Sequence, residues 1–196
     1  MRKTTVVRRD ASAKIIKPFL EATPGKQSSF ILQHGRGFNS APLPEEDVKE
    51  VMRDAGRLRL LRKACYSNAA QLALDHPDKY TYVEGYVLAG IIPVRHAWVV
   101  DRRGRVIDLT LRDRKVTEAE LNHELNNVGR VSSLDRKNIL GRIPDGWEYF
   151  GVPIKTEYVR KRALETKRYG SLIDDWEHGF PLLKLPQNTV KDEVLT

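Results

Sequence analysis

Three consecutive stretches rich in aromatic and β-branched residues constrain the fold of this chain more than any other feature. They run from Tyr80 to Leu88, from Ile91 to Asp101 and from Arg105 to Asp113. Such residues suit the pleated surface of a β-sheet, and short connections favour antiparallel neighbours. The second and third stretches are joined by Arg102-Arg103-Gly104, which is typical of a hairpin loop. We therefore expect a small antiparallel sheet.

A helix is expected to begin at Cys65, ahead of these strands. One helical face then carries Cys65, Ala69, Leu72 and Ala73, and Pro77 follows as a stop signal. Unpaired backbone N–H groups and the dipole at a helix start favour negative charge. This placement therefore favours the thiolate form of the cysteine.

Four other segments complete the expected secondary structure. A helix begins near Pro44, since Pro is tolerated in the first turn and the acidic residues after it suit the positive end of the dipole. A capping-box pattern at Thr117 opens another helix, which Gly129 closes. Tyr149 to Ile154 is expected as a further strand, and an amphipathic helix follows from about Thr156 to Tyr169.

Length and composition indicate a single α+β domain. With 196 residues, of which 40% are hydrophobic and 31% charged, the chain is long enough for one substantial core. We expect residues 45–180 to form this domain, with the Cys65 helix packed on the small antiparallel sheet. Residues 1–44 are expected as an N-terminal extension or lid, and residues 181–196 as a C-terminal tail. The tail has no strong periodicity and is a candidate for disorder.

Composition disfavours several functional classes. No apolar run approaches the roughly 20 residues that cross a bilayer, and the N-terminus lacks the apolar stretch of a secretory signal. We therefore expect a cytoplasmic protein without a membrane partner. A single cysteine cannot form an internal disulfide or a Cys-rich zinc site, and the histidines at positions 34, 76, 96, 123 and 178 lack metal-site pairing. No metal or other cofactor is expected.

The charge of the chain favours anionic partners only weakly. The formal net charge is +8 and the sequence pI is about 9.6, which raises the expectation of contact with nucleic acid or an acidic protein. The excess is diffuse, because acidic residues are interspersed with basic ones over most of the chain. We therefore expect only weak, nonspecific contact with nucleic acid that fades by physiological salt.

Three short segments carry candidate catalytic residues. They hold Cys65, His96 within the sequence Arg-His-Ala-Trp-Val, and Asp108 within Val-Ile-Asp-Leu-Thr. A thiol that attacks a carbonyl needs a base to make it a thiolate, and the base needs a partner that fixes its tautomer. A carboxylate bonded to the distal imidazole nitrogen is such a partner. The three residue types therefore match the needs of nucleophilic catalysis.

The hairpin register decides whether His96 and Asp108 can meet. If the loop has three residues and Gly104 is left-handed, Trp98 pairs with Asp108. His96 and Asp108 then point to the same face of the sheet as diagonal neighbours. A two-residue loop would put them on opposite faces. The position of the glycine predicts the first register.

Together the three segments resemble the papain-like and transglutaminase-like superfamily, in which a Cys opens the central helix, a His lies on a following strand and an Asp on the next. The resemblance covers Cys65 to Thr110, with Tyr149 to Ile154 as a late strand, and the His-Ala-Trp and Asp-Leu-Thr pieces are similar to the transglutaminase-like version. It implies a papain-like fold and a catalytic triad of Cys65, His96 and Asp108. The implied activity is that of a cysteine peptidase, amidase, deamidase or transglutaminase-like enzyme acting on a protein, peptide or small amide.

The oxyanion hole is only half defined by the sequence. The backbone N–H of Cys65 is one donor. Papain-like enzymes add a Gln upstream of the Cys, but Gln33 lies much farther upstream than that pattern requires. The second donor is therefore unassigned.

Each candidate residue also has a structural interpretation. Cys65 could be a small buried hydrophobe, His96 a core histidine with satisfied hydrogen bonds, and Asp108 the cap of a turn. The chain could then be a basic binding module with a non-catalytic triad, in contact with nucleic acid or an acidic protein. Glu84 and Asn68 either line a cleft or serve the structure, Glu84 through pairing with an arginine and Asn68 through helix hydrogen bonding.

Overall fold

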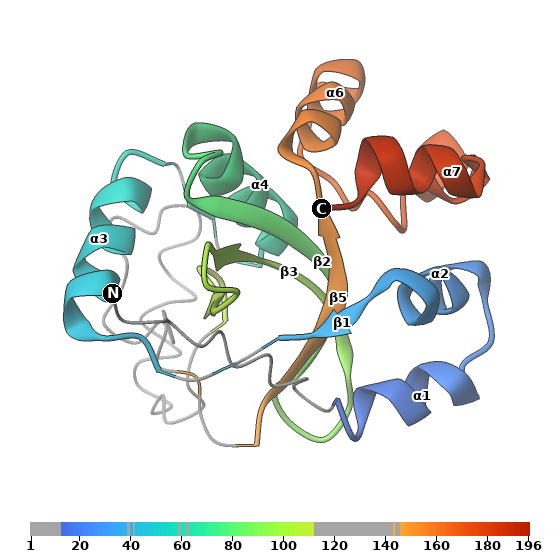
Figure 1. Ribbon diagram of the computed structural model, residues 1–196, viewed down its shortest axis with the longest axis horizontal. Helices are drawn as coiled ribbons and strands as arrows, with labels where there is room; N and C mark the ends of the chain where they lie inside the picture. The colour runs from blue at the N-terminus through green and yellow to red at the C-terminus, as the bar shows by residue number, and fades with distance from the viewer. Residues whose placement is uncertain are drawn as a thin grey trace, which may run out of the picture.

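A five-stranded antiparallel sheet forms the centre of the molecule (Figure 1). The computed structural model describes residues 13–38, 40, 42–58, 60–61, 63–111, 143 and 146–196. Within these residues the strand order is β1-β5-β2-β3-β4. The strands are β1 (Arg36–Gly37), β2 (Tyr80–Leu88), β3 (Val94–Asp101), β4 (Val106–Ile107) and β5 (Glu148–Ile154). The fold is α+β, as expected from the sequence.

Helices surround the curled sheet (Figure 1). They are α1 (Ile16–Ala22), α2 (Lys26–His34), α3 (Glu45–Ala55), α4 (Cys65–Asp75), α6 (Thr156–Thr166) and α7 (Gln187–Thr189), with further helical turns over Trp176–His178, Leu182–Lys184 and Val190–Val194. Helix α4 packs on β2 and β3, whereas α1 and α2 pack on β5. The predicted helix starts at Pro44 and Cys65 are confirmed, because α3 begins directly after Pro44 and α4 begins at Cys65.

The two faces of the sheet belong to separate apolar clusters, since successive side chains along a strand point to opposite sides. Tyr82, Val99 and Val152 belong to the large core cluster that also includes residues of α4. Trp98 and Tyr149 lie in a smaller cluster on the other side. His96 has the same strand parity as Trp98, so it points to the second face.

The β3–β4 hairpin has the predicted register. Val99 pairs with Ile107 and Val100 with Val106, a register that places Trp98 opposite Asp108. Gly104 has a φ of +75° and its N–H donates to the carbonyl of Asp101. The three-residue loop is therefore confirmed.

Both strands of the hairpin are shorter than the sequence indicated. β3 begins at Val94, and Ile91 and Ile92 lie exposed in the preceding turn. β4 ends at Ile107, because the next side chain, that of Asp108, accepts hydrogen bonds from the following backbone and turns the chain. Residues 112–113 and the helix expected over 117–129 lie outside the described residues.

The segments expected as extension and tail contribute to the same core. Ile16, Leu20 and Ile31 are buried, and β1 pairs with β5. At the other end, Val194 is fully buried and Leu195 forms a bridge with Ile154. The tail is therefore packed on β5 rather than disordered, because the side chains of Leu182, Val190 and Val194 are buried in the large core cluster.

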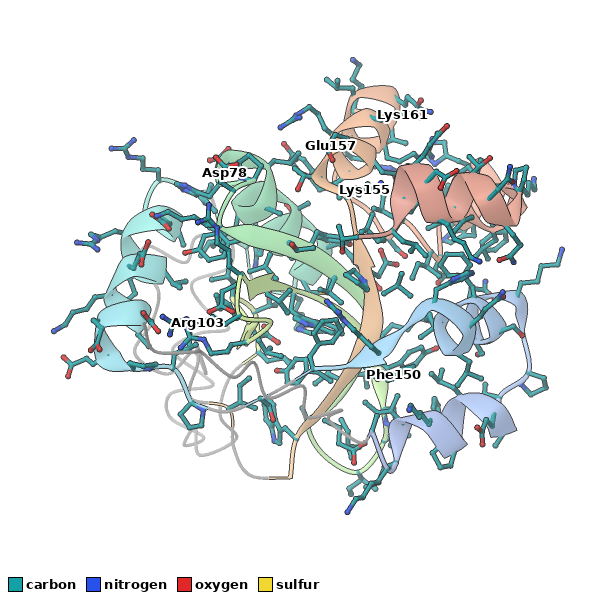
Figure 2. The ribbon with its side chains drawn as sticks, viewed as in Figure 1. Asp78, Arg103, Phe150, Lys155, Glu157 and Lys161 are labelled. Atoms are coloured by element: carbon teal, nitrogen blue, oxygen red, sulfur yellow. The ribbon has the colours of Figure 1, made fainter. Side chains whose placement is uncertain are left out.

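Charges of both signs mix on the surface. Figure 2 shows Lys155, Glu157 and Lys161 around the start of α6, and Asp78 and Arg103 on another part of the molecule. Helix α6 ends at Thr166, three residues earlier than predicted, since Lys167 takes a left-handed conformation with a φ of 59°. Among the described helices, none has the length and apolar character needed to span a bilayer.

Substitution of Gly104 tests the turn that sets the register. Gly104→Ala should lower the free energy of unfolding by about 1–2 kcal/mol, because the left-handed region is unfavourable for a residue with a Cβ. Apart from Gly104 itself and its two chain neighbours, no heavy atom lies within 4 Å of the added Cβ, so the cost is one of backbone conformation. Chemical denaturation measures the loss. Gly104→Asn should lose less, since Asn tolerates this region; equal stabilities of Gly104→Ala and wild type would contradict the left-handed turn.

Candidate active site

The structure brings the three candidate catalytic residues to one place from three elements. Cys65 is the first residue of α4, His96 lies in β3, and Asp108 directly follows β4. His96 and Asp108 are 4% and 0% exposed, whereas Cys65 is half-buried. The partly exposed thiol of Cys65 can be reached by a substrate, while the buried side chains of His96 and Asp108 are kept from water.

His96 and Asp108 form a short hydrogen bond, with 2.6 Å between Nε2 and Oδ2. The hydroxyl of Tyr149 donates to the same Oδ2 at 3.1 Å. The backbone N–H groups of Thr110 and Leu111 donate to Oδ1 at 2.8 and 3.0 Å. Asp108 therefore caps a turn and binds the imidazole at once, so the structural and the catalytic interpretations of this residue are compatible.

The electrostatics of the pair favour two opposite charges. Burial, the largest single influence, lowers the pKa of His96, but the charge and hydrogen bond of Asp108 and smaller contributions from Cys65 raise the pKa to about 10. Burial raises the pKa of the Asp108 carboxyl, but His96 and the two backbone donors together hold it below its ordinary value. We infer an imidazolium beside a carboxylate at neutral pH.

Cys65 lies beside the imidazole. Both a hydrogen bond and a charge interaction with Cys65 contribute to the raised pKa of His96. Because Asp108 occupies Nε2, Nδ1 is the ring nitrogen left for the thiol. The thiol also lies at the N-terminus of an eleven-residue helix, where the dipole and free N–H groups favour negative charge.

Aromatic rings cover the buried pair. The rings of Trp98 and His96 are stacked, with centroids 6.3 Å apart and an interplanar angle of 17°. Trp98 also meets Tyr149 edge to face at 5.1 Å. Trp98 is 1% exposed and shields the His96 side of the pair from solvent. In this dry environment the hydrogen bond between His96 and Asp108 is stronger than it would be in water.

Glu84 has a structural role rather than a place in the cleft. Its carboxylate is buried in β2 and accepts from Tyr82, from the hydroxyl of Ser171 and from the N–H groups of Leu172 and Ile173. Burial raises the pKa of Glu84 despite these four donors. The sequence interpretation of an arginine partner was wrong, because backbone and hydroxyl donors satisfy the carboxylate instead.

Tyr66 is a neighbour of the site that the sequence did not reveal. Burial, followed by the charges of Glu84 and Cys65, raises the pKa of its hydroxyl, which a hydrogen bond with Ser171 partly opposes. The hydroxyl therefore remains protonated at neutral pH. Its position beside the nucleophile follows from chain adjacency, but its contact with Ser171 joins residues about a hundred positions apart, which no local pattern indicates.

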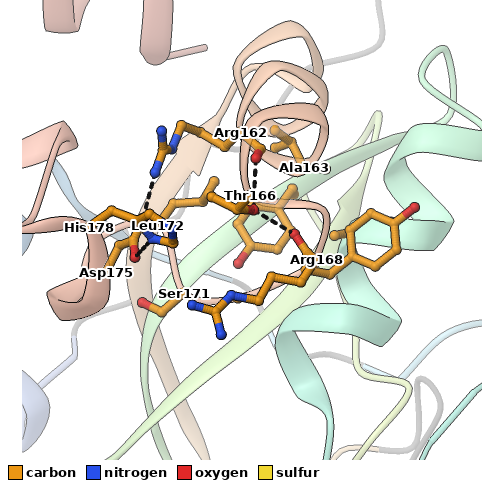
Figure 3. Close-up of a pocket in the computed structure, with 13 residues that line it drawn as sticks. Arg162, Ala163, Thr166, Arg168, Ser171, Leu172, Asp175 and His178 are labelled. Carbon is orange, nitrogen blue, oxygen red and sulfur yellow. Dashed lines mark hydrogen bonds and ion pairs between the residues drawn. The ribbon is translucent and has the colours of Figure 1, made fainter.

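A pocket lies next to this contact, between α6, α4 and the segment that leads to Trp176–His178 (Figure 3). It is lined by Ala70, Tyr82, Val159, Arg162, Ala163, Thr166, Arg168, Tyr169, Gly170, Ser171, Leu172, Asp175 and His178. The candidate catalytic residues do not line it. Ser171 connects the pocket to the candidate site, since it lines the pocket and forms a hydrogen bond with Tyr66.

Asn68 and Gln33 are both engaged elsewhere. The Asn68 carboxamide is 1% exposed and bonds the backbone of Leu61 and the hydroxyl of Thr110. Gln33 lies on α2 and exchanges hydrogen bonds with Gln187. The Gln33 carboxamide is therefore engaged with the C-terminal segment.

The remaining described histidines lie outside the site. His76 contacts the carbonyl of Asp54, His178 contacts Asp175, and His34 packs on Phe30. His123 falls outside the described residues. In the part of the chain that the structure describes, no three His, Cys, Asp or Glu side chains are grouped so as to hold a metal ion.

Comparisons with family models, with curated proteins and with solved structures found no significant match for this chain. Function must therefore be inferred from the geometry of the site.

The pH dependence of stability tests the charged pair. Because the pKa of His96 is about 10 in the folded chain and 6.5 ordinarily, its stabilising contribution is fully present below pH 6.5 and is lost as the pH rises to about 10. Across this window the free energy of unfolding should fall by up to about 1.4 kcal/mol per pH unit. Urea denaturation at a series of pH values measures the slope.

His96→Gln provides the control for other groups that titrate in this range. The variant should be less stable at pH 6 and should show a smaller slope than the wild type. Parallel curves for the two proteins would show that His96 does not carry a proton in the folded state above pH 6.5.

Proposed function

We propose that this protein is a cysteine-dependent acyl-transfer enzyme with Cys65 as nucleophile, His96 as acid and base, and Asp108 as the residue that orients His96. The observation that carries the proposal is the buried His96–Asp108 hydrogen bond of 2.6 Å beside a thiol at a helix N-terminus. A core histidine alone would not need a buried carboxylate and a half-exposed thiol as its two neighbours.

The proposed reaction has two stages. The Cys65 thiolate attacks the carbonyl carbon of an amide, and the negative charge moves to the carbonyl oxygen, near the backbone N–H of Cys65. The imidazolium of His96 then gives its proton to the leaving nitrogen as the carbon–nitrogen bond breaks. This step releases an amine and leaves a thioester on Cys65.

The second stage restores the enzyme. Water, or a second amine, adds to the thioester while neutral His96 takes its proton. The carbon–sulfur bond breaks, Cys65 leaves as thiolate, and the product is a carboxylic acid or a new amide. Asp108 remains a carboxylate throughout and stabilises the charged imidazole.

The element order supports the papain-like and transglutaminase-like class as the setting for this chemistry. A Cys at the start of a helix, a His on a following strand and an Asp after the next strand occur in the order that this resemblance implies. The substrate class that fits is an amide of a protein, a peptide or a small molecule. The nature of the acceptor separates hydrolase from transferase.

A chromogenic acetyl ester, p-nitrophenyl acetate, tests nucleophilic catalysis without knowledge of the natural substrate. Wild-type protein should release nitrophenolate faster than Cys65→Ala, and intact mass should show one acetyl group on Cys65. Asp108→Asn should slow acylation by about 10- to 10⁴-fold, because the amide offers His96 the wrong hydrogen-bonding partner.

Asp101→Asn is the matched control, since Asp101 lies in the same hairpin and binds Arg105 rather than His96. It should acylate at nearly the wild-type rate. Each variant needs a stability measurement, because loss of one partner of a buried charged pair costs about 3–5 kcal/mol. Equal acylation of wild type and Cys65→Ala would refute the enzyme proposal and favour a binding module.

A further inference from the structure

The proposed reaction requires the thiol and the imidazole to be held at a fixed separation, although they come from different layers of the fold. Cys65 belongs to helix α4, whereas His96 and Asp108 belong to the β3–β4 hairpin. Packing alone allows a helix to shift on a sheet by fractions of an ångström. A polar contact between the helix and the Asp108 turn would remove that freedom.

Asn68 makes this contact. It lies three residues after Cys65, nearly one helical turn, and its side chain is 1% exposed. Its Nδ2 donates to the Thr110 hydroxyl at 3.0 Å. The backbone N–H of Thr110 in turn donates to Asp108 Oδ1 at 2.8 Å. Helix, turn and carboxylate are thus linked by two hydrogen bonds.

The same carboxamide also holds the chain that enters the helix. Leu61 N–H donates to Asn68 Oδ1 at 2.9 Å, and Asn68 Nδ2 donates to the Leu61 carbonyl at 2.8 Å. Lys63, two residues before Cys65, has a φ of 57°, a region that residues with a Cβ seldom adopt. Such a conformation persists only where its surroundings determine it, and the paired Leu61 backbone is one such constraint.

The site demands a carboxamide. It presents one N–H group, one carbonyl and one hydroxyl, so its partner must both accept and donate. A carboxylate would set an oxygen against the Leu61 carbonyl, and an apolar side chain would leave buried backbone groups unpaired.

We propose that Asn68 is a positioning residue, which fixes Cys65 relative to His96 by tying the start of α4 to the Asp108 turn through Thr110. This proposal rests on the proposed function. It predicts that the contact with Thr110 governs the reactivity of Cys65 and not only the stability of the fold.

Thr110→Val tests the hydrogen bond between Asn68 and Thr110. It removes the Thr110 hydroxyl but keeps the shape of the side chain and the hydrogen bonds of Asn68 to Leu61. The readout is the rate of alkylation of Cys65 by iodoacetamide, measured from pH 5 to 9 on folded protein. The rate near pH 7 should fall by about 10- to 100-fold, and the pH profile should shift toward that of His96→Ala. Thr110→Ser, which restores the hydroxyl, should recover the wild-type rate and profile.

Thr81→Val on β2 is the control for the substitution itself, because Thr81 pairs with Val100 and is not a partner in the hydrogen bonds of Asn68 and Thr110 described above. It should leave the profile unchanged. If Thr110→Val does not fold, Thr110→Ala and Asn68→Asp replace it, with the same expected loss of reactivity.

The outcomes separate the two proposals. If wild type and His96→Ala react alike, the thiol is not activated by the imidazole, and both proposals fail. If they differ while Thr110→Val keeps the wild-type rate and profile, the proposed function stands and the positioning role of Asn68 is overturned, even where stability falls.

Discussion

The hydrogen bond between His96 and Asp108 is the interaction on which the rest of the site depends. Two charged groups held away from water are stable only when their remaining hydrogen-bonding positions are filled. Tyr149, Thr110 and Leu111 fill those positions on the carboxylate. The fold must therefore bring a residue of β5, the turn after Asp108 and strand β3 to one point. Because this turn starts at Asp108, β4 ends at the residue before it.

The sequence predicted the parts of the site that local rules determine. A helix start at Cys65 follows from apolar spacing and from Pro77. The shared face of His96 and Asp108 follows from the position of Gly104, because a side-chain period of two converts loop length into facing. These rules concern neighbours in the chain or across one hairpin, which is why they succeeded here.

The support around the site could not be read from the sequence. The bonds of Glu84 to Ser171 and of Asn68 to Thr110 join segments 87 and 42 positions apart. Nothing in the local pattern distinguishes such a residue from one that lines a cleft. The C-terminal tail was missed for a related reason, since the apolar side chain of Val194 is buried through tertiary contact rather than through periodicity. The ends of strands were predicted wrongly where hydrogen bonds to side chains compete with the backbone hydrogen bonds between strands.

We infer that Cys65 and the His96–Asp108 pair form one coupled unit, and nuclear magnetic resonance of ring-labelled histidine measures this coupling. We expect His96 in the wild type to titrate with a pKa of about 10 and its pKa to be lower in Cys65→Ala, because Cys65 is one of the groups that raise it. An unchanged pKa in Cys65→Ala, or a neutral imidazole at pH 7 in the wild type, would show that the thiol and the pair are not coupled in this way.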